Sequence, residues 1–244
     1  AMKNGETKLL YGDDFQFIDV SDVAEAVQSI QEIYQRAVKT YGLEQVQVLS
    51  PFRLKSDAGV KSLNQMLREL ANPLLNKTME LSYGNTSFRF GDKVMQTKNT
   101  EVASNGDIGF IAKVDKNNDD VLTVKFSDHR CKTYTIDELN QLELAYATTI
   151  HKSQGSEYEC VILPILSSFY VMLQRALIYT AITRAKKKVI LVGQKKALFM
   201  AIHKNSSVKR YTWLGKRIQE AYKKKIEGKK TAMVHTKTPE QLAL

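Results

Sequence analysis

The sequence lacks the loop by which most ATPases hold their phosphates. No Gly-x-x-x-x-Gly-Lys-Ser/Thr segment occurs anywhere in the 244 residues. The chain has two Gly-Lys pairs, at Gly215-Lys216 and Gly228-Lys229. Arg210 and Lys223 stand where the loop would need its first glycine. By itself, the chain is therefore not expected to hydrolyse a nucleoside triphosphate.

Cysteine is also scarce, and long apolar runs are missing. Cys131 and Cys160 show no Cys-x-x-Cys spacing, so neither a disulfide framework nor a zinc site is predicted. This usage fits a reducing cytoplasm, where we expect the protein to lie. The four histidines lack metal-ligand spacing, and no metal-binding residues are expected. No apolar stretch approaches the roughly 18 residues of a membrane span, so no membrane partner is predicted.

Positive charge is in excess. The net charge is +10 and the sequence pI is about 9.4, which favours a polyanionic partner such as nucleic acid. Residues 223–244 hold six lysines and two glutamates and form a predicted basic C-terminal tail. The rest of the chain keeps a moderate basic excess.

The N-terminal part follows an α/β rhythm. Residues 15–20 alternate as a strand does, and apolar residues over 23–38 have helical spacing. Residues 46–49 predict a second strand and residues 60–70 a second helix. This order predicts a parallel sheet covered by helices.

The middle of the chain has a different pattern. Short alternating segments separated by Asn, Asp and Gly turns predict strands near 93–97, 108–114, 121–126 and 132–136. Such a series predicts a small antiparallel barrel.

The α/β rhythm then resumes. Strands are predicted near 143–148, 159–164 and 187–193, with a helix around 172–184. The barrel is therefore predicted as an insertion. The expected division is a first α/β part at 1–87, the inserted barrel at 88–143, a second α/β part at 144–222 and the tail at 223–244.

Two stretches carry the most specific information. Residues 147–157 read Ala-Thr-Thr-Ile-His-Lys-Ser-Gln-Gly-Ser-Glu, a polar, hydroxyl-rich loop after a strand. Residues 179–185 read Tyr-Thr-Ala-Ile-Thr-Arg-Ala and end an apolar helix with Arg184. They resemble the fifth and sixth motifs of superfamily-one DNA helicases, most closely the RecD-like, 5′-to-3′ branch. The resemblance extends over about residues 8–222.

The resemblance implies a fold and its ligands. It implies a RecA-like domain of the P-loop NTPase type that lacks its own P-loop, with an inserted SH3-like barrel. ATP and Mg²⁺ would be bound mainly by an N-terminal RecA-like domain of the same polypeptide. The opening Ala1-Met2-Lys3 resembles a cloning remnant ahead of an internal fragment, so we expect a longer natural protein.

The resemblance also implies nucleotide-facing residues. Arg184 matches the arginine finger of the sixth motif, and Arg53 in Ser-Pro-Phe-Arg resembles the arginine of the fourth, which also approaches the γ-phosphate. Gly155 and Glu157 match the nucleotide-facing end of the fifth motif, where the carboxylate would bond a ribose hydroxyl. The alternatives are that Arg184 balances a helix macrodipole and that Arg53 is an ordinary surface residue.

A second set is implied to face DNA. Its members can hold phosphates without reading bases: Thr148, Thr149, His151, Lys152 and Ser153. In the alternative interpretation, Ser153 caps a short helix and His151 is a surface residue. Lys93 and Gln96, in a Gly-Asp-Lys-Val-Met-Gln segment that recurs around the family's barrel, are further candidates for DNA contact.

The function predicted from this resemblance is the C-terminal motor region of an ATP-dependent 5′-to-3′ DNA helicase that binds single-stranded DNA. Two alternatives stay open. One is a stand-alone, non-catalytic nucleic-acid-binding module, and the other is the helicase portion of a conjugative relaxase.

Overall fold

The structure is a computed structural model that describes residues 10–54, 56–74, 79–204, 213 and 216–223. The chain forms two compact units, residues 1–205 and 206–244. Within the described part of the second unit, residues 216–223 are helical. The predicted basic tail lies outside the described residues, apart from Lys223. None of the described helices is both long and apolar enough to cross a bilayer.

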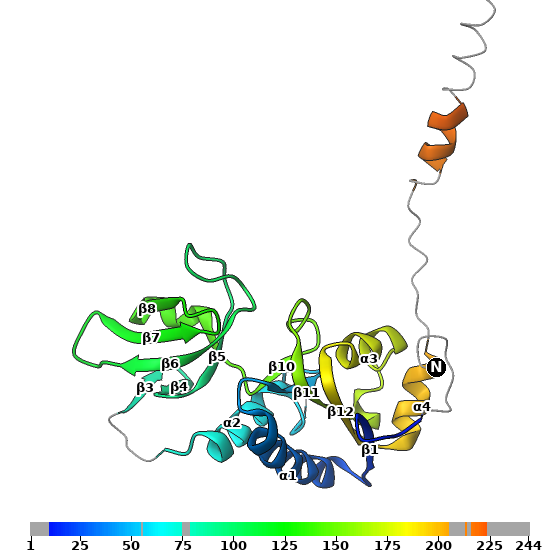
Figure 1. The fold of residues 1–244 in the computed structure, drawn as a ribbon, viewed down its shortest axis with the longest axis horizontal. Coiled ribbons are helices and arrows are strands. Elements are labelled where there is room, and N and C mark those ends of the chain that lie inside the picture. Colours follow the sequence, from blue (N-terminus) through cyan, green and yellow to red (C-terminus); the bar gives the residue numbers. More distant parts are fainter. Residues whose placement is uncertain (1–9, 55, 75–78, 205–212, 214–215, 224–244) are drawn as a thin grey trace, which may run out of the picture. The chain divides into compact units, whose positions relative to one another are not determined.

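The first unit contains a parallel five-stranded sheet, ordered β1-β12-β11-β2-β10 (Figure 1). Its strands are β1 Phe15–Asp19, β2 Val46–Ser50, β10 Ala147–Thr149, β11 Tyr158–Ile165 and β12 Ala185–Gly193. All five residues of β2 are buried, as expected where both faces of a parallel sheet are covered. The predicted α/β fold is confirmed.

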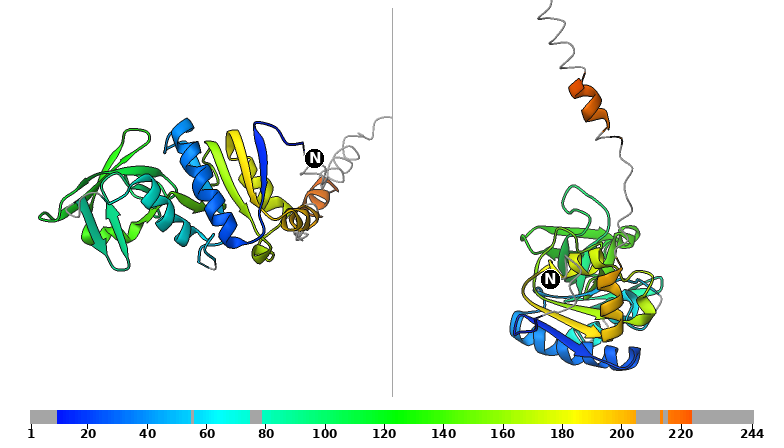
Figure 2. Two further views of the ribbon diagram at one scale, coloured as in Figure 1. Left: turned by 90° about the horizontal axis from the view of Figure 1, so that it is seen from below. Right: turned by 90° about the vertical axis from the view of Figure 1, so that its right-hand side faces the viewer.

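Helices pack on this sheet. They are α1 Val23–Tyr41, α2 Val60–Ala71, α3 Arg175–Ile182 and α4 Lys195–His203, with a short 3-10 turn at Ser167–Phe169. Helices α1 and α2 lie side by side, and α3 packs with α4 (Figures 1 and 2). The Asp22 carboxylate caps α1 by accepting a bond from the Glu25 amide at 2.9 Å. Helix α4 was not predicted from the sequence.

A second, antiparallel sheet has the order β8-β7-β6-β5-β9. Its strands are β5 Lys93–Gln96, β6 Ile108–Val114, β7 Asp120–Phe126, β8 Cys131–Thr135 and β9 Leu142–Leu144, with a 3-10 helix at Ile136–Gln141. A hairpin of β3 Glu80–Tyr83 and β4 Thr86–Arg89 adds Leu81 and Phe88 to its core. This second core therefore draws on residues that precede position 88, and we refer to the antiparallel sheet and its hairpin together as the barrel.

The single strand predicted near 143–148 is in fact two strands. β9 pairs with β5 of the antiparallel sheet, and β10 pairs with β2 of the parallel sheet. Ala145 and Tyr146, between them, are fully buried. Hydrophobic periodicity could not separate the two strands, because this short crossing stays buried throughout.

A buried carboxylate joins the two cores. Asp92 is inaccessible to solvent and pairs with Arg68 of α2, with Nη2 at 2.7 Å from Oδ2. Tyr146 Oη donates to Asp92 at 2.9 Å and Asn72 Nδ2 at 2.8 Å. The Arg89 amide donates at 2.7 Å. The carboxylate thus ties α2, the barrel and the β9–β10 crossing together.

Lys93 lies beside this pair and is equally buried. Its ammonium donates to Leu43 O at 3.1 Å, Val46 O at 3.0 Å and Gln47 Oε1 at 3.2 Å. A lysine has three such donors, so the buried group is satisfied. Burial nevertheless lowers the pKa of Lys93 to about 7.

Replacing Asp92 with asparagine should destabilise the fold strongly, because it removes the closer of the two carboxylates that pair with the buried Arg68 guanidinium. We expect Asp92→Asn to lower the free energy of unfolding by about 3–5 kcal/mol, measured by urea denaturation. Asp115→Asn is the matched control, since Asp115 pairs with a Lys113 whose side chain is 62% exposed. A loss for Asp92→Asn no larger than that of the control would contradict this role.

Lys93 should make stability depend on pH. Below about pH 7 the folded protein carries the buried charge, and between pH 7 and the ordinary pKa of 10.5 the unfolded chain binds the additional proton. Stability relative to Lys93→Met should therefore rise by about 2–3 kcal/mol from pH 7 to 9. Denaturant titrations across this range measure it, with Lys98→Met, which removes an exposed amine, as control. Parallel profiles for the wild type and Lys93→Met would refute the prediction.

Candidate functional site

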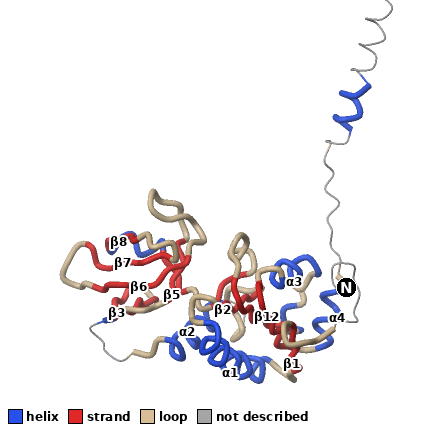
Figure 3. Tube along the Cα trace, in the orientation of Figure 1, coloured by secondary structure: helices blue, strands red, loops and turns tan. Residues whose placement is uncertain are grey.

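Strand β10 and the loop that joins it to β11 hold seven of the eleven predicted site residues. Figure 3 draws the loops of the structure in tan. Ser153 anchors the β10–β11 loop, since Oγ donates to Ile150 O at 2.8 Å and its amide donates to Thr149 O at 3.2 Å. The Lys152 amide donates to Thr149 Oγ1 at 3.3 Å. Gly155 has φ +90° with open space around it, so its backbone conformation is the reason for glycine there. The loop is a series of tight, internally bonded turns.

Only part of the predicted DNA-facing set reaches solvent. His151 is exposed, and Thr149 and Lys152 are partly exposed. Ser153 is fully buried, its hydroxyl donates to a carbonyl within the loop and does not cap a helix amide, and Thr148 is 3% exposed. The predicted DNA contact of the Ser153 side chain is therefore not supported, because its hydroxyl already has a partner inside the loop.

The other two DNA candidates lie on β5 and are buried. Lys93 and Gln96 are both inaccessible to solvent. Gln96 Oε1 accepts from Tyr134 Oη at 2.7 Å, and Nε2 donates to Gln141 Oε1 at 3.1 Å. The prediction that they contact DNA is wrong for this structure, because their polar ends satisfy internal partners. The polar side chains of Lys93 and Gln96 predicted surface positions, whereas in the structure they form hydrogen bonds inside the protein.

Arg184 lies where the structure joins the end of α3 to β12. Its Nη1 donates to Ser156 O and its Nε to Thr180 O, both at 3.3 Å. The side chain is part-buried and forms no ion pair with any carboxylate of the described residues. The end of α3 thus orients Arg184, which is compatible with the alternative that this arginine balances the helix macrodipole. No carboxylate of the described residues neutralises its charge.

Glu157 lies on the same edge of the sheet. It directly follows Ser156, which Arg184 contacts, and its carboxylate is 60% exposed and pairs loosely with Lys186 at 3.6 Å. Gly155 precedes Ser156 in the same loop. The structure therefore brings together three residues of the predicted nucleotide set at the amino ends of β11 and β12.

Arg53 lies elsewhere. It follows the carboxyl end of β2, which is parallel to β11 and β12, whereas Arg184 precedes the amino end of β12. About 25 Å of strand separates the two positions, at 3.3 Å per residue. Arg53 pairs instead with Glu143 at 2.7 Å, and Lys152 pairs with the same carboxylate at 2.8 Å. The structure therefore does not bring Arg53 and Arg184 together.

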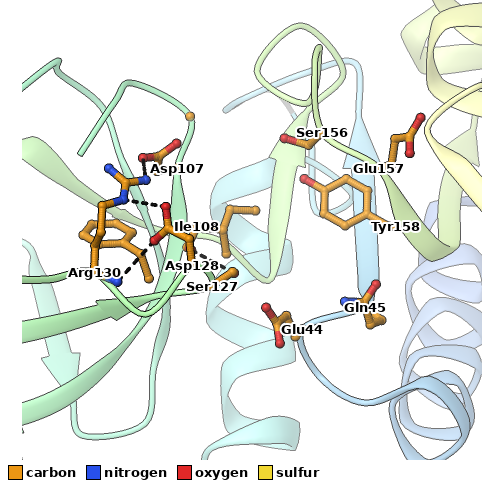
Figure 4. A pocket seen from close by; sticks show the side chains of 12 residues that line it. Glu44, Gln45, Asp107, Ile108, Ser127, Asp128, Arg130, Ser156, Glu157 and Tyr158 are labelled. Carbon is orange, nitrogen blue, oxygen red and sulfur yellow. Dashed lines mark hydrogen bonds and ion pairs between the residues drawn. The ribbon is translucent and has the colours of Figure 1, made fainter. Parts of the chain in front are cut away.

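A cleft of about 320 Å³ opens between the barrel and the amino edge of the sheet (Figure 4). The charged side chains that line it are Glu44, Asp107, Asp128, Arg130 and Glu157. Arg130 is neutralised by Asp107 and Asp128. The cleft is thus acidic and unsuited to phosphate groups. Across the described residues, no group of three His, Cys, Asp or Glu side chains could hold a metal ion.

Comparison with known protein families fits this architecture. Residues 63–126 match the family described as the SH3 domain of ATP-dependent RecD-like DNA helicases. Residues 144–192 match the family described as the UvrD-like helicase C-terminal domain. The first match covers α2, the hairpin and part of the antiparallel sheet, and the second covers the β10–β11 loop and Arg184.

Curated relatives agree with these matches. The chain is 38% identical to an ATP-dependent RecD2 DNA helicase of Deinococcus radiodurans over 154 residues, which is 62% of this chain and 20% of that protein. It is 29% identical to the RecBCD enzyme subunit RecD of Haemophilus influenzae over 225 residues, 90% of this chain and 32% of that protein. The chain thus spans about a fifth to a third of these relatives.

Solved structures include a Bacteroides Pif1 helicase in complex with ADP-AlF3 and ssDNA. It is similar at 15% identity with a TM-score of 0.45, over 80% of this chain and 54% of that one. The chain thus contains two segments that match RecD-like and UvrD-like helicase domain families, and it is similar to parts of helicases named RecD2 and RecD.

Proposed function

We propose that this chain is the second RecA-like domain of an ATP-dependent 5′-to-3′ DNA helicase motor. In this proposal it binds single-stranded DNA and supplies an arginine finger to ATP at the interface with an N-terminal RecA-like domain of the same polypeptide. The observation that supports it best is the position of Arg184 against Ser156, between Gly155 and Glu157 in the chain. The relatives named as helicases support the reaction class.

Arg184 has the properties that a finger needs. Its guanidinium donates to Ser156 O, Thr180 O and Thr183 Oγ1, which are neutral acceptors. Its positive charge therefore stays available for the charge that develops on the transferred phosphoryl group. Orientation by the end of α3 reduces the conformational entropy lost when it meets that group.

This chain supplies only part of the proposed nucleotide site. Glu157 can accept bonds from ribose hydroxyls, and Gly155 leaves open space for close approach of a ligand. Neither residue cradles phosphates, and the sequence has no phosphate loop. ATP and Mg²⁺ would accordingly be held mainly by the N-terminal domain, where the bound metal would stabilise charge on the phosphates.

The β10–β11 loop supports coupling between ATP and DNA. Thr149, His151 and Lys152 lie at its beginning, near the carboxyl end of β10, and Gly155 and Glu157 lie at its end, near the amino end of β11. Closure of the nucleotide interface on Arg184 would shift this internally bonded loop as a unit. Phosphate contacts from hydroxyl, imidazole and ammonium groups do not depend on base identity, as translocation requires.

Arg184→Ala in the full-length protein tests the finger. We expect kcat for DNA-stimulated ATP hydrolysis to fall by about a thousandfold or more, while affinity for single-stranded DNA changes by less than about threefold, because the DNA-facing residues lie elsewhere on the loop. Lys195→Ala is the matched control, since Lys195 is 76% exposed and pairs with Asp19 at the opposite edge of the sheet. Near wild-type turnover in Arg184→Ala would refute the finger.

A further inference from the structure

Glu143 bridges two cations that come from different loops. One carboxylate oxygen lies 2.7 Å from Arg53 Nη2, and the other lies 2.8 Å from Lys152 Nζ. Arg53 follows β2, Lys152 lies in the β10–β11 loop, and Glu143 belongs to β9 of the antiparallel sheet. All three side chains are at least one-third exposed, so the cluster is open to a ligand.

The cluster lies in a groove formed by two neighbouring hollows. The larger one, about 400 Å³, runs between α2 and the β3–β4 hairpin, and the smaller one lies beside Thr148 and Lys152. Arg53 and Glu143 line both. Lys61 adds a further cation, whereas Glu143 is the only carboxylate among the described residues that line the groove.

A second observation points to a missing ligand. Thr148 lines the smaller hollow, is 3% exposed, and its hydroxyl has no hydrogen-bond partner within the described part of the chain. A buried hydroxyl without a partner is costly. An anionic oxygen entering the hollow behind Arg53 and Lys152 would accept its proton.

The geometry points to a phosphate. A carboxylate and a phosphodiester both offer two anionic oxygens to a pair of cations. We propose that Arg53 and Lys152 bind a backbone phosphate of single-stranded DNA, and that Glu143 occupies this site in the DNA-free protein as a phosphate mimic that the strand displaces. This inference rests on the proposed function and gives Arg53 a role in strand binding.

The position of the groove favours DNA over the nucleotide. It lies at the carboxyl ends of β2 and β10, next to His151, whereas Arg184 lies at the amino edge. The cleft at that other edge is acidic and would repel a strand. Because a phosphate must first displace Glu143, it binds more weakly than it would to unpaired cations. The weaker contact favours release of the strand at every translocation step.

The test measures binding of a fluorescent oligothymidine to the full chain by anisotropy at several salt concentrations. Glu143→Gln should bind about three- to tenfold more tightly near 0.1 M salt, because the competing charge is gone. The slope of log K against log salt should steepen by about 0.7, one more net counterion released. Arg53→Gln combined with Glu143→Gln should lose the gain.

Glu159→Gln is the matched control, because it removes a carboxylate that pairs with Lys187 at 2.6 Å on another surface. It corrects for the general effect of net charge. Glu143→Gln binding no more tightly than Glu159→Gln, with wild-type binding intact, would overturn the phosphate mimic alone. Failure of every variant and of the wild type to bind the oligonucleotide would overturn the proposed DNA-binding function itself. Circular dichroism of each variant confirms that the fold is retained.

Discussion

The buried carboxylate of Asp92 is the constraint on which the rest of the structure depends. A charge without solvent needs partners at fixed positions, and Asp92 finds them on α2, on the barrel and on the crossing between β9 and β10. An apolar contact would tolerate sliding, whereas these bonds have one geometry. They fix β9 relative to β10, and so determine that Glu143 meets Lys152 and Arg53.

The parallel sheet places two groups of candidate site residues on different edges. Strands that run the same way have their amino ends on one edge and their carboxyl ends on the other. Arg184, Gly155 and Glu157 gather on the amino edge, and the Arg53–Glu143–Lys152 cluster lies on the carboxyl edge. A single bonded loop connects the edges. In the proposed motor, a shift of this loop at one edge would reach the other edge without a change in the sheet.

Charge pairing distinguishes residues of similar type within this arrangement. Arg68 is neutralised inside the protein, Arg53 is bridged by a carboxylate at the surface, and Arg184 contacts only neutral oxygens. The sequence shows three arginines near helix ends or turns, and nothing in the local pattern tells them apart. Lys93 is similar, since a lysine between turns predicts a surface and the fold buries it.

The sequence by itself determined the α/β class, most strands and helices, the presence of an antiparallel insertion, and the segments that carry the site, because periodicity and motif wording are local. It missed the β3–β4 hairpin and α4 and merged β9 with β10. Only the tertiary structure decided that Arg53 and Arg184 lie on opposite edges, that Lys93 and Gln96 are internal, and that Glu143 contacts both cations. These outcomes depend on strand direction, burial and contacts between distant segments, which no local pattern encodes.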